Sequence, residues 1–211
     1  HTVAWSRRCK AEFEKRAEAF GDKGKRPLLF AVVQGGSDPE LRRECAERLL
    51  SIGFDGYGYG GWPIGDDGLL VDMVGRVSEL VPDKYPKHAL GIGKPENVAS
   101  DFDCGYRMFD CALPTRDARH KRLFVFQPGF EKYRKAGTDF YRCVYLQDRK
   151  HARDAGPLDE TCDCPCCSRY SCGYLHHLFE IDDPVALRLA TLHNLRFYCR
   201  LMQWLASDSK P

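Results

Sequence analysis

The first half of the chain alternates short apolar runs with longer segments of helical periodicity. Residues 28–33 form a continuous apolar run, which is the pattern of a strand buried on both faces. Asp38 and Pro39 follow, and they predict a helix that begins there and ends near Ile52. Further strands are expected at residues 56–60, 87–91 and 106–109, and further helices at 3–20, 69–81 and 95–103. This alternation predicts parallel βαβ units and an α/β fold.

The pattern changes after residue 110. Residues 123–127 and 140–147 predict two antiparallel strands, which precede a cysteine-rich loop and the final helices. The last helix is expected over residues 184–204, where apolar residues recur every three or four positions. These residues are Val185, Leu189, Leu192, Leu195, Cys199 and Met202. His193 lies on the flank of this stripe, so we expect it to face partly inward.

The cysteine-rich loop reads Cys162-Asp163-Cys164-Pro165-Cys166-Cys167. Three thiolates with C-x-C-x-x-C spacing can bind one ion, and a fourth ligand then completes a tetrahedron. The sequence therefore predicts a closed, structural zinc site made by Cys162, Cys164, Cys167 and His193. The alternatives are ordinary reduced or paired cysteines, and a different ligand set. The residues that could replace a ligand are Cys166, Cys172, His176 and His177.

Charge is nearly balanced over the 211 residues but unevenly distributed. There are 32 Lys and Arg against 30 Asp and Glu, yet residues 115–153 hold eleven basic and four acidic residues. This local excess favours a polyanionic partner, although a solvated basic face is the simpler alternative. The eleven cysteines, odd in number and with metal-type spacing, favour the reducing cytoplasm. No apolar run approaches the ~20 residues of a membrane span, and no signal peptide is found, so no membrane association is expected.

The residues at the expected strand ends are candidates for a functional site. In α/β sheets and barrels, function is found where the parallel strands end. The four ends carry Gln34-Gly35-Gly36, Gly60-Gly61-Trp62-Pro63, Gly91-Ile92-Gly93-Lys94 and Asp110-Cys111. Glycines, an amide, a lysine and a carboxylate would suit a flat heterocycle lying against the backbone. The simpler alternatives are glycine turns and a helix-capping role for Asp110.

Several motifs closely resemble the tRNA-guanine transglycosylase family. They are Val33-Gln34-Gly35-Gly36, Gly53–Tyr57, Gly60-Gly61, Met108–Arg119, Cys162–Leu178 and His193-Asn194. The resemblance implies a (β/α)8 TIM-type barrel with a zinc-binding subdomain. It also implies a glycosyltransferase that replaces guanine in tRNA by a 7-deazaguanine such as preQ1, queuine or preQ0, as in queuosine biosynthesis.

The resemblance also implies roles for individual residues. Asp110 corresponds to the nucleophile, which would form a covalent ribosyl ester before the incoming base displaces it. Gln34, Gly60 and Gly61 correspond to base contacts, and Arg116 and Arg119 to positions that hold the RNA. Cys162, Cys164, Cys167 and His193 correspond to the zinc ligands.

The chain departs from the family pattern beside these motifs. Trp62-Pro63 and Leu90 alter the expected wall of the base pocket. We also assign Lys94 to this pocket. Lys121 and Arg122 add charge beside the nucleophile loop and join the expected nucleic-acid contacts.

Four strands are only half of an eight-stranded barrel. We therefore expect residues 1–127 to form the C-terminal half-barrel and residues 128–211 to form the zinc-binding subdomain with the C-terminal helices. In the family, the other half supplies a second aspartate that acts as acid and base. The sequence therefore predicts a need for an N-terminal half or a partner subunit, and a homo- or hetero-oligomer. Two alternative functions are the same exchange on DNA and a non-catalytic RNA-binding or scaffold subunit.

Overall fold

The structure, a computed structural model, describes residues 1–17, 26–65, 72–130 and 139–207. The chain divides into two compact units. The first comprises His1–Ile92 and Ser100–Cys111, and the second comprises Gly93–Ala99 and Ala112–Pro211. The strand expected near residues 123–127 therefore belongs to the second unit.

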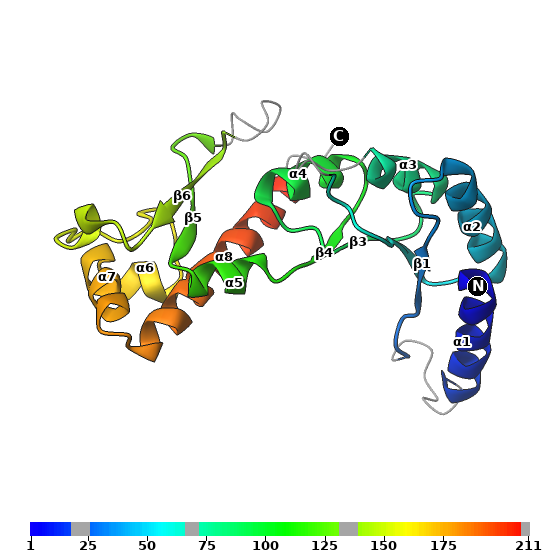
Figure 1. The fold of residues 1–211 in the computed structure, drawn as a ribbon, viewed down its shortest axis with the longest axis horizontal. Helices are drawn as coiled ribbons and strands as arrows, with labels where there is room; N and C mark the ends of the chain where they lie inside the picture. Colours follow the sequence, from blue (N-terminus) through cyan, green and yellow to red (C-terminus); the bar gives the residue numbers. More distant parts are fainter. Residues whose placement is uncertain (18–25, 66–71, 131–138, 208–211) are drawn as a thin grey trace. The chain divides into compact units, whose positions relative to one another are not determined.

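A four-stranded parallel sheet forms the centre of the first unit (Figure 1). Its strands, in spatial and sequence order, are β1 (Phe30–Val33), β2 (Gly56–Tyr59), β3 (Lys87–Leu90) and β4 (Met108–Asp110). Parallel pairing throughout confirms the βαβ prediction and fits a partial TIM-type fold. The register pairs Gly58 with His88 and Leu90 with Asp110, so the carboxyl ends of neighbouring strands meet at one edge.

The helices of this unit pack on the sheet or on one another. They are α1 (Thr2–Ala17), α2 (Pro39–Ile52) and α3 (Met73–Leu80), while α4 (Pro95–Asp103) begins in the second unit and ends in the first. Asp38 caps α2 as expected, because its carboxylate accepts from the backbone nitrogens of Glu40 (2.8 Å) and Leu41 (3.2 Å). Side chains of α2 and α3 pack on the buried strand residues Ala31, Val33, Tyr57, Tyr59 and Ala89. The predicted helix ends at residues 18–20 and 69–71 lie outside the described residues.

The second unit combines an antiparallel hairpin with helices. The hairpin strands are β5 (Arg122–Phe126) and β6 (Tyr141–Tyr145), which confirms the predicted antiparallel pair. Its helices are α5 (Leu113–Arg119), α6 (Pro165–Arg169), α7 (Cys172–Glu180) and α8 (Pro184–Ser207), with a 3-10 turn, η3, at Arg149–His151. The long helix α8 packs against α5, α6, α7 and β5.

The predicted apolar stripe of α8 is wrong in register. Val185 and Leu195 are 44% and 43% exposed, whereas His193 and Asn194 are fully buried. The buried face consists of Ala186, Leu189, Ala190, His193, Asn194, Phe197, Leu201, Trp204 and Leu205. The pattern misled because two polar residues are on the core side, where hydrogen bonds satisfy them.

Asn194 explains how α8 tolerates a polar residue in its core face. Its Nδ2 donates to the carbonyls of Pro114 (3.0 Å) and Arg122 (3.1 Å), and its Oδ1 accepts from the backbone nitrogen of Phe124 (3.1 Å). One amide therefore joins α8 to α5 and β5 within the second unit. Because these partners are backbone groups, the helix cannot rotate without leaving buried polar atoms unpaired.

Among the described residues, no helix combines the length and the apolar character that crossing a bilayer requires.

Candidate functional site

Asp110 lies at the carboxyl end of β4, with its side chain 63% exposed. Its Oδ1 lies 2.8 Å from Nε2 of His88 and accepts a hydrogen bond from the backbone nitrogen of Gly91 at 3.3 Å. Gly91 has a φ of 74°, a backbone conformation that favours glycine. Two contacts therefore fix one carboxylate oxygen, while the other, Oδ2, has no hydrogen-bond partner in the described part of the chain. Such a carboxylate is oriented and accessible at the same time.

His88 is a site residue that the sequence reasoning missed. It lies on β3, paired in register with Gly58 on one side and Met108 on the other. Its side chain is 24% exposed and contacts the Asp110 carboxylate, which the backbone of Gly91 also contacts. The signal was available in the strand period, since His88 and Leu90 are two residues apart and share a face, and Leu90 pairs with Asp110.

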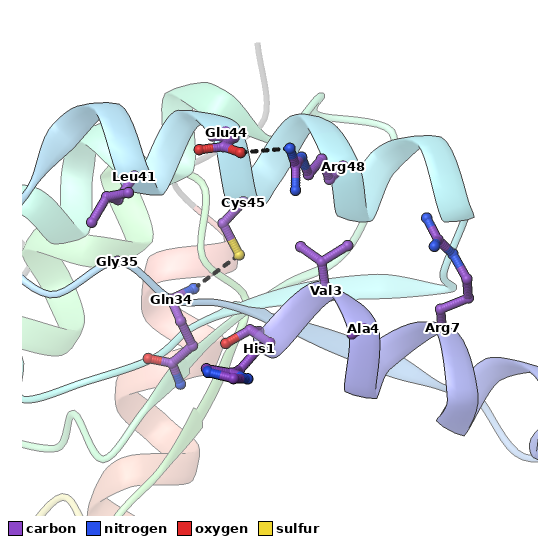
Figure 2. Close-up of a pocket in the computed structure, with 11 residues that line it drawn as sticks. His1, Val3, Ala4, Arg7, Gln34, Gly35, Leu41, Glu44, Cys45 and Arg48 are labelled. Atoms are coloured by element: carbon purple, nitrogen blue, oxygen red, sulfur yellow. Dashed lines mark hydrogen bonds and ion pairs between the residues drawn. The ribbon is translucent and has the colours of Figure 1, made fainter.

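Gln34 and Gly60 come together at the ends of β1 and β2. A Cβ atom on Gly60 would lie 2.4 Å from Nε2 of Gln34, so the amide passes directly over this glycine. The backbone nitrogen of Gln34 donates to Sγ of Cys45 at 3.5 Å (Figure 2). Gln34 also lines a pocket of about 510 Å³ between the first residues of α1 and helix α2, where Figure 2 shows Val3 and Leu41 on its walls.

Arg42 holds the two loops that carry these residues. Its Nη1 donates to the carbonyls of Val33 (2.8 Å) and Gly60 (2.7 Å), and its Nε and Nη2 donate to Gly36 (3.0 and 2.9 Å). The guanidinium is 1% exposed and lies 4.5 Å from the ring centre of Tyr59. The available signal was an arginine at helical spacing from the apolar residues Cys45, Ala46 and Leu49, and the sequence reasoning missed it.

The remaining expected base contacts differ in their surroundings. Trp62 is 80% exposed and borders a second pocket of about 510 Å³ that also includes Gly61 and Arg42. Leu90 lies over Gly58, because a Cβ on that glycine would be 2.5 Å from the Leu90 side chain. Lys94 belongs to the second unit. The structure therefore brings Gln34, Gly60, Leu90 and Asp110 to one sheet edge, and it does not place Lys94 with them.

The expected nucleic-acid residues lie in the second unit and are not equivalent. Arg116 and Arg119 are exposed on α5. Arg122 is partly buried, donates to Sγ of Cys143 at 3.2 Å and lies 3.4 Å from Asp117. Lys121 has its ammonium 5.8 Å from the ring centre of Phe179. Part of the basic segment, residues 131–138, lies outside the described residues.

Cys162, Cys164, Cys167 and His193 form a buried group that could bind a metal ion. Their ligand atoms all lie within 4.8 Å of one another, with Nδ1 of His193 3.3 Å from Sγ of Cys167 and 3.7 Å from Sγ of Cys164. Three sulfurs and one imidazole nitrogen match the donors that zinc prefers. Cys166 is also buried but does not belong to the group.

Neighbouring groups orient these ligands. Nε2 of His193 donates to the carbonyl of Phe124 at 2.8 Å, which leaves the Nδ1 lone pair facing the sulfurs. Asp163, between two cysteines, pairs with Arg196 of α8 at 2.5 and 2.9 Å. Hydrogen bonding with Cys162 raises the pKa of the Cys167 thiol well above its usual range, and burial adds to this effect. The proximity of three sulfurs and one imidazole nitrogen fits a metal ion, which would displace the thiol protons on binding.

These features define a partial TIM-type α/β protein with a polar site at its strand ends and a separate Cys/His group. The family model described as queuine tRNA-ribosyltransferase matches residues 1–205, and the chain belongs to this family. The resemblance seen in the sequence motifs is thereby confirmed.

Curated relatives give the same result. The chain is 37% identical over 203 residues to the queuine tRNA-ribosyltransferase of Psychrobacter sp. (strain PRwf-1), covering 96% of this chain and 49% of that protein. It is 36% identical over 203 residues to that of Solidesulfovibrio magneticus, with 96% and 49% covered. It is 35% identical over 210 residues to that of Methylacidiphilum infernorum, with 98% and 51% covered. The chain thus spans about half the length of the curated relatives it matches.

Proposed function

We propose that this chain carries the nucleophile of a transferase that exchanges guanine in tRNA for a 7-deazaguanine. The observation that carries the proposal is Asp110, an exposed carboxylate whose Oδ1 is fixed by His88 and Gly91. The family to which the chain belongs supports the same reaction class, since the relatives are named queuine tRNA-ribosyltransferases. These names favour tRNA over DNA as the substrate.

The reaction follows double displacement. A carboxylate oxygen of Asp110 attacks C1′ of the target nucleotide, the bond from C1′ to the guanine nitrogen breaks, and guanine leaves with the bonding electrons and takes up a proton. The product is a ribosyl ester on Asp110. The incoming base then attacks C1′ from the vacated side, loses a proton and releases the carboxylate, so the configuration is retained. The target nucleotide must leave its stack to reach the carboxylate.

His88 is the positioning residue for this nucleophile. Because His88 and Gly91 hold Oδ1, the lone pairs of Oδ2 are the ones left to approach C1′. A carboxylate that already has its attacking orientation loses less rotational freedom in the transition state.

We assign the base pocket to Gln34, Gly60, Gly61, Trp62 and Leu90, all of the first unit, and we leave Lys94 out because it belongs to the second unit. The amide over Gly60 and the buried Arg42 behind it support this assignment, because they fix hydrogen-bonding groups where a flat base could approach the backbone. The identity of the incoming base, preQ1, queuine or preQ0, depends on this pocket.

Arg116, Arg119, Lys121 and Arg122 are our candidates for contacts to tRNA. The exposure of Arg116 and Arg119 on α5 supports a direct role for these two, whereas Arg122 is partly buried and donates to Cys143. Asp117 lies near both Arg116 (3.5 Å) and Arg122 (3.4 Å). Replacing Arg116 and Arg119 by Ala should weaken tRNA binding. It should also make the slope of log affinity against log salt concentration shallower, by the amount expected for about two lost phosphate contacts. A salt slope equal to that of the unmodified protein would contradict this role.

The buried Cys162, Cys164, Cys167 and His193 group holds a structural zinc ion in this proposal. When bound, the ion would cross-link the loop before α6 to helix α8, with no open position for a substrate. Eleven free cysteines support a reducing cytoplasmic location.

Further strands should complete the barrel. β1 and β4 are edge strands of the four-stranded sheet, and exposed parallel edges tend to pair with more strands. The relatives are about twice as long as this chain, which supports a requirement for additional βα units in the same protein or a partner subunit. We place the second aspartate, the acid and base of the reaction, in those units.

An exchange assay tests the proposal. Radiolabelled guanine should enter tRNA in the presence of the natively purified protein, and Asp110→Asn should lower the rate at least about a thousandfold while tRNA binding is retained. Asp103→Asn, which changes an exposed carboxylate outside the site, is the matched control. Exchange by Asp110→Asn within tenfold of wild type would contradict the assignment, and normal tRNA binding without any exchange would favour a non-catalytic RNA-binding subunit.

A further inference from the structure

A second group of metal-type side chains lies outside both the strand-end site and the Cys3His group. It consists of His151 at the end of η3, Asp154 in the following loop and Cys172 at the start of α7. One ligand atom from each residue lies within 4.8 Å of the others. Neither the family description nor the names of the relatives assign a role to these residues.

The backbone fixes this loop against α7. The backbone nitrogen of Cys172 donates to the carbonyl of Gly156 at 2.7 Å, and that of Gly173 donates to the carbonyl of Asp154 at 2.8 Å. A Cβ on Gly173 would lie 2.8 Å from the same carbonyl oxygen, so the loop approaches the helix as closely as glycine permits. The three side chains are therefore held in place by main-chain contacts.

The distances fit a shared ion. Sγ of Cys172 lies 3.6 Å from Nδ1 of His151, compared with 3.3 and 3.7 Å between sulfur and imidazole in the Cys3His group. A sulfur and a nitrogen on one tetrahedral zinc ion are about 3.5 Å apart, given metal–ligand bonds of about 2.3 and 2.0 Å. Thiolate, imidazole and carboxylate are also the donors that zinc accepts.

The imidazole of His151 supports a ligand role independently. Its Nε2 is buried and has no hydrogen-bond partner among the described residues. A buried polar nitrogen without a partner is costly, and an ion bound through Nε2 would supply the missing partner. Cys172 is 1% exposed, so its sulfur faces this group rather than solvent.

The group faces open space on one side. His151, Asp154 and Cys172 all line a cavity of about 670 Å³, which Val125, Phe126 and Arg142 also border. Three protein ligands beside a cavity leave a fourth position for water or a small anionic or neutral donor, unlike the closed Cys3His group. We propose that His151, Asp154 and Cys172 form a second site for a zinc-type divalent transition metal ion, with an open coordination position toward this cavity.

Cobalt titration of the full chain tests the site without relying on activity. The metal-free, reduced protein should bind about two Co²⁺ ions per chain, one with strong thiolate absorption from three sulfurs and one with weaker absorption from a single sulfur. Cys172→Ser and His151→Ala should each bind about one Co²⁺ ion and lose only the weaker absorption. Cys199→Ser, an exposed cysteine of α8, should behave as wild type.

Two outcomes would overturn the proposal. One is a single Co²⁺ ion per wild-type chain at saturation, a measurement that needs no variant to fold. The other is a second ion that persists in Cys172→Ser with unchanged absorption. Asp154→Asn, which keeps the size of the side chain, should weaken the second ion at least about tenfold, because it removes the anionic ligand.

Discussion

Nε2 of His88 lies 2.8 Å from Oδ1 of Asp110, and the two residues come from neighbouring parallel strands. The contact is set by register, since His88 pairs with Met108 and Leu90 with Asp110 on the same face. We propose that this pair is the centre of the catalytic site.

Removing the His88 imidazole should slow ribosyl transfer without weakening tRNA binding. His88→Gly is expected to lower kcat about 10- to 100-fold and leave KM for tRNA unchanged, because the lost contact orients only the nucleophile. Added imidazole should restore part of the rate, as the side chain is accessible from solvent. Met108→Leu, on the adjacent strand, is the control. A change in KM alone, or no rescue by imidazole, would indicate a merely structural role.

Arg42 should be required for the strand-end loops to keep their positions. Arg42→Met leaves the carbonyls of Val33, Gly36 and Gly60 without their donor, so the free energy of unfolding should fall by about 3–5 kcal/mol. Arg43 is the neighbouring residue and forms an exposed ion pair with Glu40. Arg43→Ala should therefore change the free energy of unfolding by less than about 0.5 kcal/mol. Urea denaturation gives both values, and equal effects would contradict the role of Arg42.

Two neighbouring buried cysteines, Cys164 inside the Cys3His group and Cys166 outside it, should differ in their effect on metal binding. Cys164→Ala is expected to lose one zinc ion relative to wild type and to lower the melting temperature, because metal binding is coupled to folding. Cys166→Ala removes a buried thiol that does not belong to the group and should keep this ion. Metal analysis by mass spectrometry distinguishes them. Full zinc retention by both Cys162→Ala and Cys164→Ala would instead favour Cys166 or Cys172 as ligands.

Asp101 should make the first unit less stable at neutral pH than in mild acid. Burial raises the pKa of Asp101 from 3.8 to about 7, and its Oδ2 has no hydrogen-bond partner among the described residues. Between these two pH values the folded state binds the proton and the unfolded state does not. The stability contribution is therefore present below about pH 4 and is lost as the pH rises to about 7, with a total on the order of 4 kcal/mol.

Asp101→Asn should remove this dependence and stabilise the protein at pH 8. Asp103→Asn, an exposed position on the same helix, should retain the slope. Chemical denaturation at several pH values between 4 and 8 is the measurement. If the free energy of unfolding depends on pH in the same way for wild type and Asp101→Asn, the Asp101 carboxyl is ionised over the whole range from pH 4 to 8 and the prediction is wrong.

The order of the elements could be predicted from the sequence because each one has a strong local signal. The apolar run of β1, the Asp38-Pro39 start of α2 and the bounds of α4 all depend on residues close in sequence. The short helix α5 escaped prediction, since seven residues show little periodicity.

The errors concern polar residues whose partners are distant in sequence. On α8, the apolar pattern left Asn194 out of the core face and placed His193 only on its flank, whereas both are fully buried and backbone partners about 70 residues away satisfy them. The role of Arg42 was also missed, because its acceptors are carbonyls on two other loops. For His88, the strand period shows that it shares a face with Leu90, but the pairing of Leu90 with Asp110 becomes known only from the strand register.

The most direct test of the account is to trap the ribosyl ester. The natively purified protein, incubated with tRNA in the absence of an incoming base and then denatured, should retain RNA in a covalent adduct. After nuclease and protease digestion, mass spectrometry should locate the ribosyl group on Asp110, and Asp110→Asn should form no adduct. A ribosyl group on another residue, or an adduct of equal yield in Asp110→Asn, would contradict the assignment of Asp110 as the nucleophile.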